Sequence, residues 1–146
     1  RGTGSIVSMS STAGIMGGLG PHAYTAAKHA IIGITKSVAA ELARYGIRAN
    51  CISPAGMATP MVAATMGDHT DLETTRKNLA EVSPLKGRPG LPQDDVNAVI
   101  FLARDESGYT SGLTLTTDAG ITIGSNNPSP FAEYQPFMGE AGKRGI

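Results

Sequence analysis

The sequence predicts an α/β fold in which parallel strands alternate with helices. Two apolar runs typical of buried strands, residues 5–10 and 47–53, are separated by a long helical pattern over residues 22–45. A strand, a crossover helix and a second strand form a βαβ unit, in which the strands run parallel and the crossover is right-handed. Because open α/β sheets bind ligands beyond the carboxyl ends of their strands, we expect the polar residues after both runs to share one site.

Composition and charge are those of a single soluble globular domain. Of the 146 residues, 40% are hydrophobic and 16% are charged, and the net charge is zero. The basic residues are scattered, so no nucleic-acid partner is expected. No apolar run approaches the roughly 20 residues of a membrane-spanning helix and no signal peptide is visible, so we expect no membrane contact and a cytoplasmic location. The single cysteine, Cys51, fits a reducing compartment, and we interpret it as a small core residue.

The first apolar run begins almost at the start of the chain. It follows Arg1 at once, as a strand would in the middle of a larger sheet, and we therefore expect residues 1–146 to be a fragment. Residues 5–10 fit a buried parallel strand whose carboxyl end carries Ser10 and Ser11. A hydroxyl at this end has a functional interpretation, with a turn or a helix cap as the alternative. The glycine-rich stretch that follows is typical of a loop and has no phosphate-binding pattern.

The long helical pattern has two faces. An apolar stripe is expected to pack on the sheet, and it consists of Ala27, Ile31, Ile34, Val38 and Leu42. A second stripe, of small residues, would let a neighbouring element or subunit approach closely, and it consists of Ala23, Ala26, Ala30, Gly33 and Ser37. Gly46 is placed to end the helix.

The remaining chain supplies further helices and a third strand. After Pro54 ends the second strand, residues 57–72 are rich in methionine, and this stretch is either core filling or a lid over an apolar substrate. The pattern then predicts a helix over 72–82, a loop over 87–92, a helix from Gln93 or Asp94 to Ala103, and a strand over 112–118. Three arginines are interpreted as surface charges, namely Arg44, Arg48 and Arg104. Beyond Gly120 an aromatic cluster is expected to pack on a pocket or on a partner, and it consists of Phe131, Tyr134, Phe137 and Met138.

Tyr24 and Lys28 are four residues apart in the predicted helix, so they lie on nearly the same side of it. An ammonium beside a phenol favours the phenolate, which produces a general acid and base. For an isolated pair of this kind, a solvated helix face is the alternative interpretation. The histidines show no metal-binding spacing, and no metal is expected.

Ser11 lies thirteen residues before Tyr24, so the three polar residues form the pattern S-x12-Y-x3-K. With this pattern the chain resembles the carboxyl-terminal half of a short-chain dehydrogenase/reductase over residues 3–123. Other segments agree with the same family, namely Gly46-Ile47-Arg48, Asn50, Pro54 to Thr59, and Gly112 to Gly120. The amino-acid sequence of residues 50–54 and 58–60 further resembles plant NAD-dependent alcohol dehydrogenases of terpenoid, lignan and xanthoxin metabolism.

The resemblance implies a Rossmann-like, doubly wound parallel sheet, to which residues 1–146 contribute about three strands and their helices. It implies an enzyme that transfers a hydride between NAD, with NADP not excluded, and a secondary alcohol or ketone, which we expect to be apolar and cyclic. Tyr24 would exchange a proton at the substrate oxygen, Ser11 would orient that oxygen, and Lys28 would favour the phenolate and hold the nicotinamide ribose. A homotetramer is the expected assembly.

The same resemblance implies the ligand contacts. The cofactor would be held by Tyr24, Lys28, Pro54, Gly56, Met57 and Thr59. The substrate would be contacted by Ser11, Thr12, Tyr24, Met61 and Met66. The glycine-rich phosphate loop and the residue that selects NAD or NADP belong to a dinucleotide-binding half that would precede Arg1 and is absent from residues 1–146.

The chain departs from the family pattern at two places. Ala55 stands where the family usually has glycine, and Ala119 interrupts the common Asp-Gly-Gly ending.

Two other functions stay open. Within the family, a reductase of 3-oxoacyl thioesters or sugars is the alternative. A non-catalytic oligomerisation or binding subunit is the alternative of another class.

Overall fold

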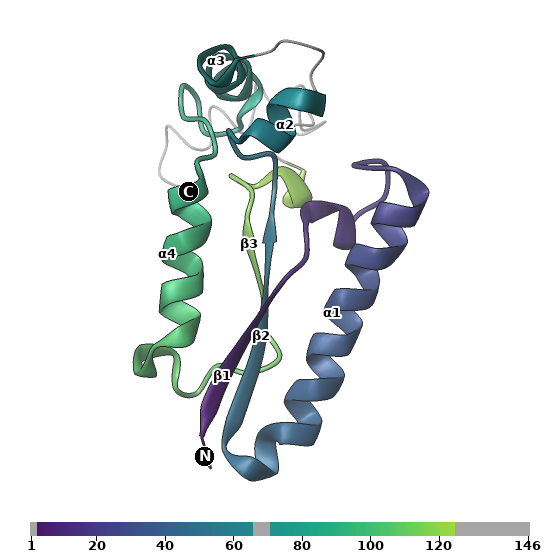
Figure 1. Ribbon diagram of the computed structural model, residues 1–146, viewed down its shortest axis with the longest axis vertical. Coiled ribbons are helices and arrows are strands. Elements are labelled where there is room, and N and C mark those ends of the chain that lie inside the picture. The colour runs from purple at the N-terminus through teal and green to yellow at the C-terminus, as the bar shows by residue number, and fades with distance from the viewer. Residues whose placement is uncertain (1–2, 66–70, 125–146) are drawn as a thin grey trace, which may run out of the picture.

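The computed structural model describes residues 3–65 and 71–124, which form a small parallel sheet between helices (Figure 1). In chain order the strands and helices are β1 (Gly4–Met9), α1 (His22–Leu42), β2 (Ile47–Pro54), α2 (Pro60–Thr65), α3 (Leu72–Val82), α4 (Pro92–Ala103) and β3 (Thr114–Thr117). Four 3-10 turns lie between them, namely η1 (Thr12–Gly14), η2 (Ala43–Tyr45), η3 (Asp105–Ser107) and η4 (Ile121–Ile123). In this part of the chain, no helix is long and apolar enough to cross a bilayer.

The three strands lie in the order β1-β2-β3, and both pairings are parallel. The register of the first pair runs from Gly4 opposite Ile47 to Met9 opposite Ile52. Helix α1 contacts β1 and β2, and α4 contacts all three strands. Figure 1 shows these two helices on opposite sides of the sheet. The predicted βαβ unit and the third strand are therefore confirmed, although β3 covers less than the predicted residues 112–118.

Strand β2 is the centre of the core. Its residues 49–53 are buried, together with Leu102 from α4 and Ala39 from α1. Cys51 is among these buried residues, and loss of solvation raises the pKa of its thiol. This agrees with the interpretation of Cys51 as a core residue.

Strand β1 is more exposed than the sequence predicts. Met9 is 53% exposed and Ile6 is 42% exposed, whereas a strand inside a parallel sheet is buried on both faces. The prediction of a buried strand was therefore wrong for Ile6 and Met9. The reason is that, among the described residues, β1 is an edge strand of this three-stranded sheet and pairs only with β2.

The face of α1 that packs on the sheet also differs from the prediction. Of the predicted stripe, Ile31, Val38 and Leu42 are half-buried, but Ala27 is exposed and Ile34 is 62% exposed. Thr35 and Ala39 are buried in their place. Thr35 can face the core because its hydroxyl donates to the Ile31 carbonyl at 2.8 Å, which leaves no unpaired polar group. The predicted stripe of small residues is exposed in this chain.

Local hydrogen bonds set where α3 and α4 begin. Asp71 caps α3 by accepting from the amides of Glu73 and Thr74 at 2.8 and 2.9 Å. Helix α4 begins at Pro92, earlier than the predicted Gln93 or Asp94. Pro is well suited to a first helical position, and the Asp94 carboxylate accepts from the Leu91 amide at 3.0 Å.

The connection from α4 to β3 is held by two polar side chains of β2. Arg48 donates to the carbonyls of Leu102, Arg104 and Thr110 at 3.0, 3.1 and 3.2 Å. The interpretation of Arg48 as an ordinary surface charge was therefore wrong. Asn50 is fully buried, donates to the Thr110 carbonyl at 2.9 Å and accepts from the Leu113 amide at 3.0 Å. Both side chains replace backbone pairing where the chain turns toward β3.

Some predictions concern residues outside the described ranges. These are Met66, as a substrate contact, and the aromatic cluster of Phe131, Tyr134, Phe137 and Met138.

We predict that Asn50→Ala lowers the free energy of unfolding by about 2 kcal/mol, because it removes both hydrogen bonds of a fully buried side chain and leaves the Leu113 amide without this partner. Urea denaturation of the parent and the variant measures this change. Asn97→Ala is the control, since the Asn97 side chain makes an exposed bond to Gln93 and its loss should cost less than about 0.5 kcal/mol. Equal effects of the two substitutions would contradict the proposed role of Asn50.

Candidate active site

The end of β1 continues directly into the turn that carries Ser11. The Ser10 amide donates to the Ile52 carbonyl at 2.8 Å, so pairing with β2 extends one residue past Met9. Ser11 has an extended backbone, and its hydroxyl oxygen accepts from the Ala13 amide at 3.2 Å, which caps η1. The alternative interpretation, in which Ser11 is a helix cap, is therefore confirmed. A hydroxyl that accepts one hydrogen bond still has its own proton to donate, so the cap does not remove a second role.

Tyr24 and Lys28 lie in the first two turns of α1 and face each other. The Lys28 Nζ atom is 5.4 Å from the centroid of the Tyr24 ring, which is within cation-π range. The Tyr24 side chain is 40% exposed and so remains accessible to a ligand. Lys28 also donates from Nζ to the Met9 carbonyl at 3.2 Å. The predicted proximity of the phenol and the ammonium is confirmed.

A glycine brings the Tyr24 ring close to the turn after β1. A Cβ atom at Gly20 would lie 2.9 Å from Cδ1 of Tyr24 and 3.7 Å from Cβ of Ala13. The ring therefore packs directly on the Gly20 backbone, beside the 3-10 turn that Ser11 caps. In the sequence, Gly20 is one of several glycines in the loop before the helix. Its position four residues before Tyr24 was the available signal, because a glycine there leaves room for the ring.

The predicted cofactor residues follow the carboxyl end of β2, the strand next to β1. Pro54 is the last residue of β2, and the amide of the next residue, Ala55, donates to the Thr117 carbonyl at 3.2 Å. Met57 is buried, and Gly56 is exposed. The Thr59 hydroxyl accepts from the Val62 amide at 3.3 Å and so supports the start of α2. The loops with Ser11 and with Thr59 thus leave the same edge of the sheet.

Two of the predicted substrate residues, Thr12 and Met61, differ in their exposure to solvent. Thr12 is buried at the start of η1. Met61 is 71% exposed on α2, so the described part of the chain does not use it as core filling.

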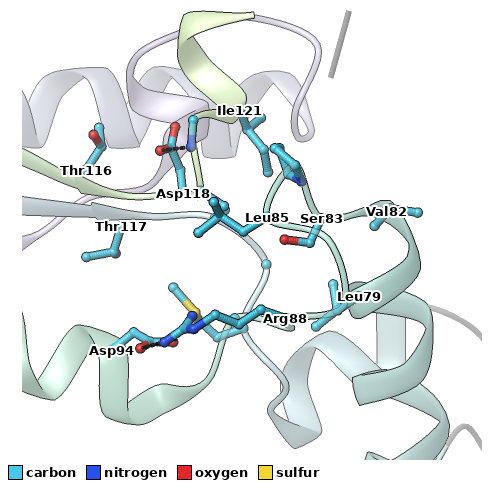
Figure 2. Close-up of a pocket in the computed structure, with 17 residues that line it drawn as sticks. Leu79, Val82, Ser83, Leu85, Arg88, Asp94, Thr116, Thr117, Asp118 and Ile121 are labelled. Carbon is cyan, nitrogen blue, oxygen red and sulfur yellow. Dashed lines mark hydrogen bonds and ion pairs between the residues drawn. The ribbon is translucent and has the colours of Figure 1, made fainter. Parts of the chain in front are cut away.

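A cavity of about 460 Å³ lies on the β3 side of this loop (Figure 2). Its apolar wall comes from α3 and the following loop, with Leu79, Val82 and Leu85, and its opposite wall comes from the end of β3. Gly56 and Met57 line it, but Ser11, Tyr24 and Lys28 do not. It is therefore separate from the space in which the phenol and the ammonium lie.

An ion pair borders this cavity. Arg88 donates to the Asp94 carboxylate from Nη2 and Nη1, at 2.5 and 3.1 Å, and this hydrogen bonding holds the pKa of Asp94 below its usual range. Asp95 lies next to Asp94 and accepts from the Thr117 hydroxyl at 2.5 Å, while burial raises the pKa of its carboxyl. These contacts join α4 to β3 and to the loop before α4.

The turn after β3 is organised by Asp118. Its carboxylate accepts from the amides of Gly120 and Thr122 at 2.9 and 2.8 Å and from the Thr122 hydroxyl at 2.6 Å. Burial by itself raises the pKa of Asp118, but the hydrogen bonds from Thr122 and Gly120 outweigh it and lower that pKa below its ordinary value.

The two departures from the family pattern have different structural consequences. Ala119 has a φ of 54° and is the one non-glycine residue with positive φ among residues 3–65 and 71–124. This is the left-handed region that glycine adopts without strain. Ala55 does not have a positive φ, so its backbone accepts a side chain without strain.

Among residues 3–65 and 71–124, no three His, Cys, Asp or Glu side chains come together as a metal site would require.

The chain matches known proteins over most of its length. Residues 1–122 match the family model described as Enoyl-(Acyl carrier protein) reductase. The chain is 49% identical to (+)-borneol dehydrogenase 2 of Salvia officinalis and 46% identical to xanthoxin dehydrogenase of Arabidopsis thaliana, with 82% of this chain covered in each case. It spans 44% and 43% of the length of these two relatives.

Solved structures with the same fold include proteins crystallised with dinucleotides. Levodione reductase matches with a TM-score of 0.73 and 33% identity, over 84% of this chain and 48% of that one. A gluconate 5-dehydrogenase from Burkholderia cenocepacia in complex with NADP and tartrate matches with a TM-score of 0.71 and 32% identity, over 84% and 46%. A short-chain dehydrogenase from Leptospira borgpetersenii with bound NAD+ matches with a TM-score of 0.64 and 34% identity, over 82% and 44%.

We predict that Ala119→Gly raises the free energy of unfolding by about 1 kcal/mol, because it removes a side chain from a left-handed backbone. Ala55→Gly is the matched control and should lower the free energy by about 0.5 kcal/mol, because it only adds freedom to the unfolded chain. Urea denaturation measures both, and a destabilised Ala119→Gly variant would contradict the strain at this turn.

We also predict that the contribution of Asp118 to stability depends on pH. Since the folded pKa is lowered, the stabilisation is complete above the unfolded pKa of about 4 and is lost as the pH falls through the folded value. Asp118→Asn should therefore be less stable than the parent at pH 7, and the difference should shrink below about pH 4. Denaturation curves at several pH values measure it, and a difference that stays constant with pH would contradict the assignment.

Proposed function

The chain belongs to the short-chain dehydrogenase/reductase family, and on that premise we propose that its protein transfers a hydride between a nicotinamide cofactor and a secondary alcohol or ketone. The observation that carries this proposal is the meeting of Tyr24 and Lys28 at the start of α1, beside the turn that Ser11 caps. The Tyr24 side chain is exposed to solvent and so accessible to a ligand, and the Lys28 ammonium lies over its ring.

In this proposal Tyr24 is the general acid and base. As a phenolate it takes the proton from the alcohol oxygen, and as a phenol it returns a proton to the carbonyl oxygen in the reverse direction. Ser11 donates its hydroxyl proton to the same oxygen and holds it in place. The positive charge of Lys28 stabilises the phenolate. When bound, the nicotinamide accepts or supplies the hydride.

The residues that we propose for the cofactor have donors to spare. Lys28 Nζ uses one N–H on the Met9 carbonyl, so two remain for ribose hydroxyls. Thr59 accepts a bond at its oxygen and keeps its proton to donate. Pro54, Gly56 and Met57 would line the nicotinamide from the loop after β2. We propose NAD as the cofactor, with NADP as the alternative.

We further propose that a dinucleotide-binding half joins this chain at β1. This edge strand has exposed apolar side chains at Ile6 and Met9, which a neighbouring strand and its helices would cover. The relatives are more than twice as long as the part that this chain matches, which supports the same proposal. The phosphate-binding loop and the choice between NAD and NADP would then lie outside residues 1–146.

As substrate we propose an apolar, cyclic secondary alcohol or its ketone. Two of the relatives are named for borneol and xanthoxin, and this supports a terpenoid-like substrate. Ser11, Thr12, Tyr24, Met61 and Met66 are the proposed contacts. A homotetramer is proposed from the exposed stripe of small residues on α1, and the free thiol of Cys51 fits a cytoplasmic location.

A second reaction of the same class is a reductase of 3-oxoacyl thioesters or sugars. The likeness to a gluconate 5-dehydrogenase supports this alternative. Turnover assays with a cyclic terpenoid alcohol, a 3-oxoacyl thioester and a sugar acid distinguish the two. A non-catalytic subunit is the alternative of another class, and it predicts that calorimetric titration of the full-length protein detects no binding of NAD or NADP.

We predict that Tyr24→Phe in the full-length protein lowers kcat by at least about 100-fold, because the general acid and base is lost. Calorimetry should show that NAD still binds. Tyr45→Phe is the control, since this exposed tyrosine packs against Arg44 outside the proposed site, and its kcat should stay within about twofold of the parent. Activity of Tyr24→Phe close to that of the parent would refute the proposed role.

A further inference from the structure

Two hydrogen bonds join the end of β1 to one residue of α1, Lys28. The Ser10 hydroxyl, which is buried, donates to the carbonyl oxygen of Lys28 at 2.7 Å. The Lys28 ammonium donates in turn to the Met9 carbonyl at 3.2 Å. Two successive residues of the strand end thus hold both the backbone and the side chain of one residue of the helix.

Gly14 allows this contact because it has no side chain. A Cβ atom at Gly14 would lie 2.3 Å from the Ser10 hydroxyl oxygen and 2.7 Å from the Lys28 carbonyl oxygen. Real Cβ atoms do not approach this closely, so even alanine would push the turn away from the helix. The backbone of η1 therefore packs directly against the Ser10 hydroxyl and the Lys28 carbonyl.

This contact joins the two elements that carry the proposed catalytic residues. Ser11 follows Ser10 on the strand side, whereas Tyr24 lies one helical turn before Lys28 on the helix side. The helix holds Tyr24 and Lys28 together by itself, but it does not fix their distance from Ser11. That distance depends on how α1 is seated against the end of β1.

We propose that Ser10 is a positioning residue, which seats α1 so that Ser11 and Tyr24 reach the same substrate oxygen, with Gly14 as the spacer. This inference rests on the function proposed above. Ser10 touches neither substrate nor cofactor in this proposal, and it acts through the Lys28 carbonyl. Misplacement of reacting groups by about 1 Å can cost about 100-fold in rate, so one hydrogen bond at this place can matter for turnover.

The chain offers a matched control for Ser10. Ser5 lies in β1, the strand that Ser10 directly follows, and its hydroxyl donates to the Leu102 carbonyl of α4 at 2.7 Å. Both bonds run from a serine hydroxyl to a helix carbonyl and have the same length, but they lead to α4 and α1, which lie on opposite sides of the sheet (Figure 1). A merely structural role predicts that any loss of activity follows the loss of stability in both variants.

The test compares Ser10→Ala with Ser5→Ala in the full-length protein loaded with NAD. We expect Ser10→Ala to lower kcat about tenfold or more, with the Kd for NAD within about threefold of the parent. Ser5→Ala should keep kcat within about twofold, and the denaturation midpoints of both variants are measured so that any loss of kcat can be compared with the loss of stability. Unchanged kcat in Ser10→Ala, or equal losses of kcat in both variants, would overturn the proposal.

A double-mutant cycle tests the mechanism of the effect. If Ser10 seats Tyr24 against Ser11, then Ser11→Ala should cost less in the Ser10→Ala background than in the parent, because the two groups no longer act together. In the Ser5→Ala background, Ser11→Ala should cost as much as in the parent. Additive costs in both backgrounds would overturn the positioning role.

Gly14 provides an independent variant with its own control. Gly14→Ala should lower kcat, whereas Gly17→Ala should not, because a Cβ atom at Gly17 meets nothing within 4 Å. If Gly14→Ala fails to fold, the serine pair still decides the question. Parent-like activity of Tyr24→Phe would refute the proposed function itself, whereas an inactive Tyr24→Phe with a parent-like Ser10→Ala would refute the positioning role and leave the proposed function standing.

Discussion

Parallel pairing of β1 with β2 is the constraint on which the rest of the site depends. The register places Met9 opposite Ile52, and the Ser10 amide extends the pairing by one more hydrogen bond to the Ile52 carbonyl. The chain leaves both strands at the same edge of the sheet, so the turn with Ser11 and the loop after Pro54 begin side by side. A shift of one residue would turn Ser10 away from α1, because side chains alternate between the two faces of a strand.

Close approach of backbones then sets the finer geometry. Gly14 and Gly20 lie where any side chain would collide, in one case with the Ser10–Lys28 hydrogen bond and in the other with the Tyr24 ring. Neither glycine has a positive φ, so both are explained by the lack of space and not by backbone conformation. The polar residues of the site are thus supported by glycines that carry no chemistry of their own.

The β3 side of the fold illustrates a different balance. Asp118 satisfies three donors of the turn that follows β3, and this turn holds Ala119 in a left-handed conformation that costs an alanine about 1 kcal/mol. The hydrogen bonds are strong enough to keep the turn in place in spite of this strain. The cavity next to it is lined by the same turn and by α3, and it remains separate from Tyr24.

The sequence by itself determined the βαβ order, the third strand, the ends of α3 and the neighbourhood of Tyr24 and Lys28. These features follow from contacts between residues close in the chain, whose spacing sets which side of a helix or strand they occupy. Only the tertiary structure decided that Thr35 and not Ile34 faces the sheet, that Arg48 and Asn50 hold the connection to β3, and that Ser10 bonds Lys28. Such contacts join residues far apart in the chain, and they depend on how closely two backbones approach, which no local pattern of apolar and polar residues records.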